Sequence, residues 1–319
     1  MAVYVNTNYS ALQGQRYLGN VQNSLTTTYQ RLSSGMRINS AKDDAAGLQI
    51  ADRLTSQING LNQGNRNASD GIALAQTAEA GMDEISSMLQ KIRTLAVQAS
   101  NGTNTNSDKQ ALAKEASSLA TEITRIAKQT TFAGKTILNG KQDNSIDPFV
   151  QGAGAAGAKG DAMSITLQVG SNKGDTISFA LVNLQFSAAA QKAGIAAGEF
   201  VDQAAADKAF VKDANGDTMK VNFTGAGMAA NIIDHMDKMI GYVDGLRADL
   251  GAIQNRLESS IRNQSNVAAN EADARSRIRD ADFAEESANL SQQSIIQQAA
   301  ASMLMQANTR PQLGLSLLG

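Results

Sequence analysis

Hydrophobic and polar positions alternate with a helical period along most of the chain. Between residues 45 and 99 every seventh position of one series is apolar, and isoleucines widen this line into a stripe: Leu54, Leu61, Ala68, Ala75, Met82, Leu89 and Ala96, with Ile58, Ile72, Ile85 and Ile92. Such spacing places the side chains on one face of an α-helix. We predict one helix over residues 45–99, roughly 80 Å long at about 1.5 Å per residue, which favours an elongated rod.

The residues that flank this stretch predict where the helix begins and ends. Ser40 precedes Asp43 and Asp44, so we expect a capping box in which Ser40 supplies the hydroxyl and the carboxylates lie at the positive end of the helix dipole. Residues 101–107 are rich in Asn, Gly, Thr and Ser, which is typical of a turn. A turn this short predicts that the next helix runs back antiparallel.

Other stretches show the same helical period and differ in strength. They are residues 8–33, with Leu18, Val21, Leu25, Tyr29 and Leu32; residues 112–126, with Leu112, Ala116, Leu119, Ile123 and Ile126; residues 232–257, with Ile232, Met236, Met239, Val243, Leu246, Leu250, Ile253 and Leu257; and a stretch beyond Asn270, with Ile278, Phe283, Leu290, Ile296, Ala300, Met303 and Ala307. The third has the most regular heptad pattern, and the long helix is its expected partner. We expect the last helix to stop at Pro311.

The middle of the chain has a different pattern. Apolar and polar residues alternate over 165–169 and 177–181 around a glycine-containing turn, which predicts a β-hairpin. An alanine-rich stretch over 187–212 predicts a helix, and residues 219–223 predict a short strand.

These elements predict a mainly α fold: an elongated antiparallel helical-bundle or coiled-coil rod with a small α+β middle region and amphipathic terminal helices. The expected organisation is an N-terminal assembly arm, the N-terminal half of the rod, a variable outer region with the hairpin, the C-terminal half of the rod and a C-terminal assembly arm. Their boundaries are 1–44, 45–140, 141–227, 228–270 and 271–319.

Composition and charge exclude several classes of protein. The chain has 319 residues, of which 42% are hydrophobic and 4% aromatic, and its formal net charge is −2. Balanced, interspersed charges predict binding to neither nucleic acid nor an anionic membrane. The absence of cysteine excludes disulfides and thiolate chemistry. Neither a signal peptide nor a membrane span is recognisable, so we expect any export to use a route without a cleaved signal peptide.

Candidate catalytic and ligand motifs are weak. Residues 152–157 match a G-x-G-x-x-G pattern but lack the expected strand and helix around it, and residues 213–217 lack the glycine and glutamate positions of a calcium loop. His235 is the only histidine and lies beside the heptad seam, so we interpret it as structural. We predict no catalytic residue, no metal and no cofactor; an enzyme that uses His235 or the glycine loop is the rival hypothesis.

Both ends of the chain carry amphipathic helices without an intramolecular core to join. The C-terminus adds four leucines over residues 313–318, which would be a liability in a monomer. Identical subunits that stack through contacts that do not close a ring form a helical filament. We therefore predict a filament-forming structural protein. The candidate assembly residues are Leu18, Val21, Leu25, Leu32, Ile296, Met303, Leu315, Leu317 and Leu318.

Two segments at opposite ends carry a resemblance to a known family. Residues 32–47, LSSGMRINSAKDDAAG, and residues 276–286, SRIRDADFAEE, resemble the signature segments of bacterial flagellin. The resemblance covers residues 1–140 and 228–319, whereas 141–227 resembles only the variable outer region and is short for the family. It implies a filament subunit for bacterial motility, in which terminal arms that are disordered before assembly pair as a coiled coil in the filament interior.

The resemblance also implies partners and a location. Flagellins are bound by an export chaperone at the C-terminal helix and leave the cell unfolded through the flagellar type III apparatus. Outside the cell they join a filament, which lies between the hook–filament junction proteins and the filament cap. A junction protein is the closest rival, since it shares the terminal helices but forms a thin ring.

A segment similar to the one here is recognised by the innate immune receptor TLR5. The matching residues are Gln90, Lys91, Ile92, Arg93, Leu95, Ala96, Val97 and Gln98, with Glu115 on the next helix. Lys91 stands where recognised members carry arginine, and lysine lacks the planar guanidinium fork. The resemblance therefore implies weaker receptor binding.

Overall fold

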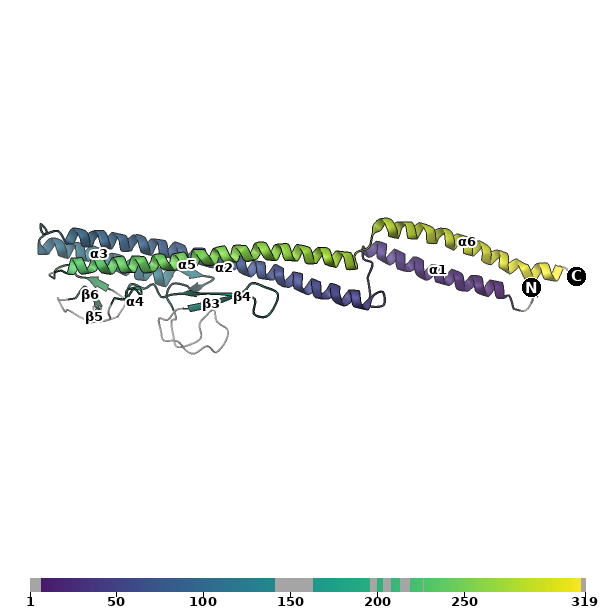
Figure 1. Ribbon diagram of the computed structural model, residues 1–319, viewed down its shortest axis with the longest axis horizontal. Coiled ribbons are helices and arrows are strands. Elements are labelled where there is room, and N and C mark those ends of the chain that lie inside the picture. Colours follow the sequence, from purple (N-terminus) through teal and green to yellow (C-terminus); the bar gives the residue numbers. More distant parts are fainter. Residues whose placement is uncertain are drawn as a thin grey trace. The chain divides into compact units, whose positions relative to one another are not determined.

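The computed structural model describes residues 7–140, 163–195, 200–202, 208–212, 219–225 and 227–316. Its elements are mainly α-helices, with short strands between α3 and α5, which confirms the predicted fold class (Figure 1). The chain divides into two compact units. The terminal unit consists of residues 1–59 and 266–319, and the central unit consists of residues 60–265. Helices α2 (Ala45–Ala99) and α5 (Met228–Arg279) contribute residues to both units.

Helix α2 begins and ends where the sequence predicts, but its cap differs from the expectation. The Oδ1 atom of Asp44 accepts a hydrogen bond of 2.9 Å from the backbone N–H of Gly47, so Asp44 is the N-cap. Ser40 was the wrong residue for this role, because it lies one turn earlier and donates its own N–H and hydroxyl to Asp43. The two successive acidic residues thus have different roles: Asp43 closes the preceding turn, and Asp44 caps the helix.

Helix α3 (Asn106–Gln129) turns back after residues 100–105. Thr105 and Asp108 form a capping box in which the Thr105 hydroxyl accepts from the Asp108 N–H and the Asp108 carboxylate accepts from the Thr105 N–H. The Thr105 hydroxyl also donates to the Asp108 carboxylate at 2.7 Å, and this bond, followed by the one from the Thr105 N–H, holds the pKa of Asp108 below its usual value.

Helices α2 and α5 run antiparallel in the central unit (Figure 1). Their side-chain contacts keep the same register. Arg93 donates two hydrogen bonds to the Asp237 carboxylate, Asp83 pairs with Arg247 at 3.0 Å, and Asn65 donates to Ser265. Ten residues along α2, from 83 to 93, correspond to ten residues back along α5, from 247 to 237. The pairing therefore has one register along its length.

The predicted seam of α5 is the core of the central unit. Its apolar positions are buried at Ile232, Met236, Met239, Val243, Leu250 and Leu257, and half-buried at Leu246 and Ile253. They pack with the apolar stripe of α2, in which Ala75, Met82, Ile85, Leu89, Ile92 and Ala96 are buried. The heptad pattern thus predicts both the helices and their contact.

Within the described residues, the strands form three small sheets in the central unit. Strands β3 (Met163–Gln168) and β4 (Thr176–Leu181) form the predicted antiparallel hairpin, in which Met163 pairs with Leu181 and Gln168 with Thr176. Strands β1 (Thr131–Phe132) and β2 (Lys135–Thr136) form a second antiparallel pair, which the sequence did not predict because each strand is only two residues long. The third sheet has the order β5 (Phe200–Asp202), β6 (Phe210–Lys212), β7 (Met219–Val221).

The helix predicted over residues 187–212 is wrong at most of the positions in this range that the structure describes. Helix α4 spans only Phe186–Lys192 and ends before Gly194, whose φ of 86° is left-handed. Residues 200–202 and 210–212 are parallel strands. The alanine content favours a helix locally, but the buried ring of Phe210 packs edge-on against Phe186 at 5.4 Å, and this long-range contact favours the sheet.

The C-terminal helical segment also differs from the prediction. Helix α5 ends at Arg279, and α6 (Phe283–Ser316) starts after a break that the apolar pattern does not reveal. Helix α6 passes through Pro311 instead of stopping there. A proline removes one backbone donor and can bend a helix without ending it.

Glycines of α2 allow the β3–β4 hairpin to approach this helix closely. A Cβ at Gly64 would collide with the carbonyl oxygen of Val169, and a Cβ at Gly71 would collide with the side chain of Leu167. Gly64 faces backbone, which cannot move aside like the end of a side chain. The helix therefore needs glycine at this position to hold the hairpin.

Gly64→Ala is expected to destabilise the central unit by about 1–3 kcal/mol, since overpacking displaces the hairpin backbone. Gly245→Ala in α5 is the control, because nothing lies within 4 Å of its added Cβ. The control should gain about 0.5–1 kcal/mol from helix propensity. Urea unfolding followed by circular dichroism measures both, and equal stability of Gly64→Ala and the parent would disprove the close approach.

Candidate assembly surfaces

Helices α1 (Tyr9–Ser34) and α6 lie side by side and antiparallel in the terminal unit (Figure 1). Asn8 caps α1 by accepting from the Ala11 N–H, and it also donates its Nδ2 to the Ala307 carbonyl oxygen at 2.8 Å. At the other end of α1, Gly35 has a φ of 70° and donates its N–H to the Arg31 carbonyl oxygen, as a helix C-cap. The amphipathic helix predicted over residues 8–33 is thus confirmed.

The α1–α6 pair encloses little apolar surface. Among the described side chains of these two helices, only Thr28, Glu286 and Ala300 are buried. The predicted assembly residues Leu18, Val21, Leu25 and Leu32 are half-buried, as is Ile296, and Met303 is 71% exposed. Leu315 is described only as part of the α6 backbone, and Leu317 and Leu318 lie outside the described residues.

Large exposed apolar side chains gather in the terminal unit. In the part of the chain that the structure describes, every such side chain except Val97 belongs to this unit: Tyr9, Leu12, Tyr17, Tyr29, Ile50, Val267, Phe283, Ile295, Met303 and Met305. A monomeric protein rarely exposes so many in one region, and such clustering marks an interaction surface. The sequence prediction missed Tyr9, Tyr17 and Ile295, because they lie off the apolar stripe that it followed.

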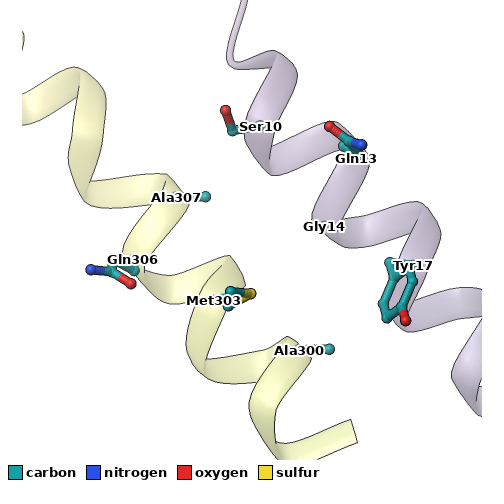
Figure 2. Close-up of a pocket in the computed structure, with 8 residues that line it drawn as sticks. All are labelled: Ser10, Gln13, Gly14, Tyr17, Ala300, Met303, Gln306 and Ala307. Atoms are coloured by element: carbon teal, nitrogen blue, oxygen red, sulfur yellow. The ribbon is translucent and has the colours of Figure 1, made fainter. Parts of the chain in front are cut away.

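A groove of about 510 Å³ runs between α1 and α6. Its lining comes from both helices: Ser10, Gln13, Gly14, Tyr17, Ala300, Met303, Gln306 and Ala307. Figure 2 shows Ala300, Met303 and Ala307 on the side of α6 that faces α1. The groove combines small residues with the exposed thioether of Met303 and the exposed phenol of Tyr17. An apolar helix can pack onto such a surface.

Backbone hydrogen bonds link the segment that connects α1 to α2 with the segment that connects α5 to α6. Arg37 and Ile38 donate their N–H groups to the Arg279 carbonyl oxygen, and Ala281 donates to Gly35. The following turn is fixed by Asp43, whose pKa is held below its usual value by the N–H of Ser40 and then by that of Asn39. The segment that follows α1 and the segment that precedes α6 therefore fix each other's position.

The receptor-like segment lies on α2 in the central unit and is partly inaccessible. Ile92, Leu95 and Ala96 are buried in the core. Gln90, Lys91, Val97 and Gln98 are exposed, Arg93 is partly exposed, and Glu115 of α3 is exposed and pairs with Lys91 at 3.5 Å. A partner at this segment would thus contact the exposed side chains, while the buried Ile92, Leu95 and Ala96 hold α2 in place.

The described residues give no support to the candidate catalytic and ligand motifs. His235 is half-buried on α5, with its ring 5.7 Å from that of Phe210. No cluster of three or more His, Cys, Asp or Glu side chains suited to a metal ion occurs within the described residues. Residues 152–157 and 213–217 lie outside them. Among the helices that the structure describes, none is long and apolar enough to cross a membrane.

Comparison with known proteins covers both helical parts of the chain. The model of the bacterial flagellin N-terminal helical region matches residues 5–143, and that of the C-terminal helical region matches residues 233–318. Flagellin A of Vibrio cholerae serotype O1 is 37% identical over 384 residues, and Flagellin A of Vibrio anguillarum is 36% identical over 384 residues; each alignment covers 100% of both chains.

A solved structure of a flagellar hook-associated protein from Vibrio parahaemolyticus shares the fold. It is 15% identical, has a TM-score of 0.55, and the match covers 75% of this chain and 100% of that chain. Because the two family models together match most of the residues and full-length relatives exceed 30% identity, the chain belongs to the bacterial flagellin family.

Proposed function

We propose that this flagellin builds the flagellar filament through the exposed apolar faces of α1 and α6. Flagellins are structural proteins and not enzymes, and self-polymerisation into the filament is the function of the family. The observation that supports α1 and α6 as the assembly surface is the contrast between their exposed apolar side chains and their few buried ones. Neighbouring subunits would bury what a single subunit leaves in water.

The central unit has a different role in this proposal. It has its own apolar core, formed by α2, α3, α5 and the strands, and Val97 is the only large apolar side chain exposed among its described residues. We infer that it holds the subunit together, whereas the arms, which we propose to be residues 1–44 and 271–319, order fully only in the filament. Isolated amphipathic helices with few buried contacts are marginal in water.

Electron microscopy of the purified protein after salt-induced polymerisation with short seeds tests this proposal. Long filaments of uniform width are the expected result. Persistent monomers at high concentration, or thin rings, would contradict it and favour a junction or adaptor protein.

Export and assembly partners follow from the same proposal. We infer that the chain reaches the cell exterior through the flagellar type III apparatus without a cleaved signal peptide, with an export chaperone on α6 and with cap and hook–filament junction proteins at the filament ends. The exposed apolar side chains of α6, such as Ile295 and Met305, need cover before assembly, which supports a chaperone there.

Binding to TLR5 is a further proposal, supported by the exposed ridge of Gln90, Lys91, Val97, Gln98 and Glu115 with Arg93. Lys91→Arg is expected to strengthen binding about fivefold, because a guanidinium can bond bidentately where an ammonium cannot. Surface plasmon resonance with the receptor ectodomain measures this effect. Lys114→Arg, at an exposed position beside Glu115, is the control and should leave binding unchanged; an equal effect of both variants would refute a specific role for residue 91.

A further inference from the structure

Among the described side chains of the α1–α6 pair, an ion pair with a buried partner stands in place of a buried apolar seam. Nη1 of Arg31 lies 3.1 Å from Oε1 of Glu286, and the Glu286 side chain is only 8% exposed. One layer away, the hydroxyl of the buried Thr28 donates to the amide oxygen of Gln293 at 3.4 Å. The most enclosed contacts between the two helices are therefore polar.

This ion pair is poorly suited to stabilise the helices. Nε of Arg31 and Oε2 of Glu286 are buried and have no hydrogen-bond partner. A buried ion pair whose remaining polar atoms are unsatisfied recovers little of its desolvation cost, and apolar side chains of similar size would often be at least as stable. A pair of this kind has its best-attested use in selecting partners and register.

The charges of α1 and α6 differ, so an ion pair between them can favour the α1–α6 pair over pairs of like helices. Helix α1 carries Arg16 and Arg31 and no acidic residue, whereas Glu285 and Glu286 lie in the first turn of α6. Two copies of α1 side by side would leave Arg31 without a carboxylate. Two parallel copies of α6 would place Glu286 beside Glu286, with no cation in the same turn. Many such arms are present together when subunits assemble, and each has an apolar face that would tolerate a wrong partner.

We propose that Arg31 and Glu286 are the pairing determinant of the terminal helices: they select the antiparallel α1–α6 pair over pairs of like helices. The inference rests on the proposed role of these helices in assembly. Arg31 and Glu286 act as positioning residues, since the apolar faces supply the attraction and the ion pair decides which helix each face meets.

The absence of cysteine from the chain permits a direct test by disulfide trapping. A Cβ at position 14 lies 3.9 Å from the Cβ of Leu304, within the range of about 3.5–4.5 Å that a disulfide requires. In full-length protein, Gly14→Cys with Leu304→Cys therefore reports the native pair through an intramolecular disulfide. Gly14→Cys alone and Leu304→Cys alone report like pairs through disulfide-linked dimers.

Each reporter is combined with changes at the ion pair and oxidised under identical conditions. Arg31→Leu with Glu286→Leu is expected to lower the ratio of intramolecular to dimeric disulfide at least about tenfold, because the wrong pairs no longer bury an unpaired charge. Arg31→Glu with Glu286→Arg should restore the parental ratio. Asp273→Leu with Arg277→Leu removes an exposed ion pair within α5 and is the matched control, which should change nothing.

A parental ratio in the leucine double variant would overturn the proposal, since the backbone bonds between the two connections would then suffice to pair the helices. A low ratio in both the leucine and the charge-exchanged variants would overturn it as well, because the site would then require particular shapes and not complementary charges. Seeded polymerisation of the cysteine-free parent, followed by microscopy, tests the proposed function separately.

Discussion

Deletion of residues 1–30 or of residues 290–319 is expected to abolish filament growth while the central unit stays folded. The first deletion removes Tyr9, Leu12, Tyr17 and Tyr29, all largely exposed in the single subunit. At about 1.5–3 kcal/mol for each side chain that becomes fully buried, the loss is about 6–12 kcal/mol per subunit as an upper bound. An assembly constant would fall by up to about four to nine orders of magnitude.

Sedimentation and electron microscopy measure the loss of filaments, and thermal unfolding followed by circular dichroism checks the central unit. A full-length variant separates surface chemistry from chain length: Tyr9→Ser with Tyr17→Ser should strongly impair growth. The matched control, Gln15→Ser with Gln22→Ser, changes exposed polar positions of the same helix and should polymerise normally. Long filaments from either truncated protein would show that the assembly energy lies outside the terminal helices.

Leu250→Asp is expected to unfold the central unit or lower its melting temperature by at least about 10 °C. Leu250 is 3% exposed in the α5 seam, where it belongs to a buried cluster of hydrophobic side chains. Lost apolar burial of about 2–5 kcal/mol and the desolvation of a carboxylate add up to much of the total stability of a typical domain.

Ala248→Asp is the control for this substitution, because residue 248 lies two positions earlier on the same helix and is exposed. It introduces the same charge and the same helix propensity without entering the core, so it should change the melting temperature by only a few degrees. If both variants melt like the parent, the antiparallel packing of α5 on α2 is wrong.

The parts of the fold that the sequence predicts well are those in which one physical effect dominates over many residues. The α2 stripe and the α5 seam repeat the same spacing for several turns, so single exceptions such as the half-buried Leu246 do not matter. The β3–β4 hairpin is equally clear, because alternation and turn glycines agree.

The parts that were missed depend on contacts between distant residues. The alanine-rich segment after residue 187 has local helix propensity, but Phe210 belongs to a sheet because of what it meets in the core. Glu286 was noted only as part of a family segment, since a glutamate in the first turn of a helix is ordinary, and nothing near Arg31 in the sequence reveals that the two would be enclosed together. Tyr9 and Tyr17 of α1 were overlooked because an apolar stripe predicts which residues face a partner helix, and these two exposed tyrosines lie off that stripe.

The in-step pairing of α2 and α5 constrains how this chain can change length. One residue inserted into only one of these helices would rotate all later side chains by about 100° and shift them by about 1.5 Å, which would separate pairs such as Arg93 with Asp237. Insertions between β2 and β3 leave that pairing untouched. The alignments with relatives extend over 384 residues, whereas this chain has 319. A subunit built in this way can gain or lose residues between its paired helices while the helices themselves keep a fixed length, so the size of the middle region can diverge independently of the helical scaffold.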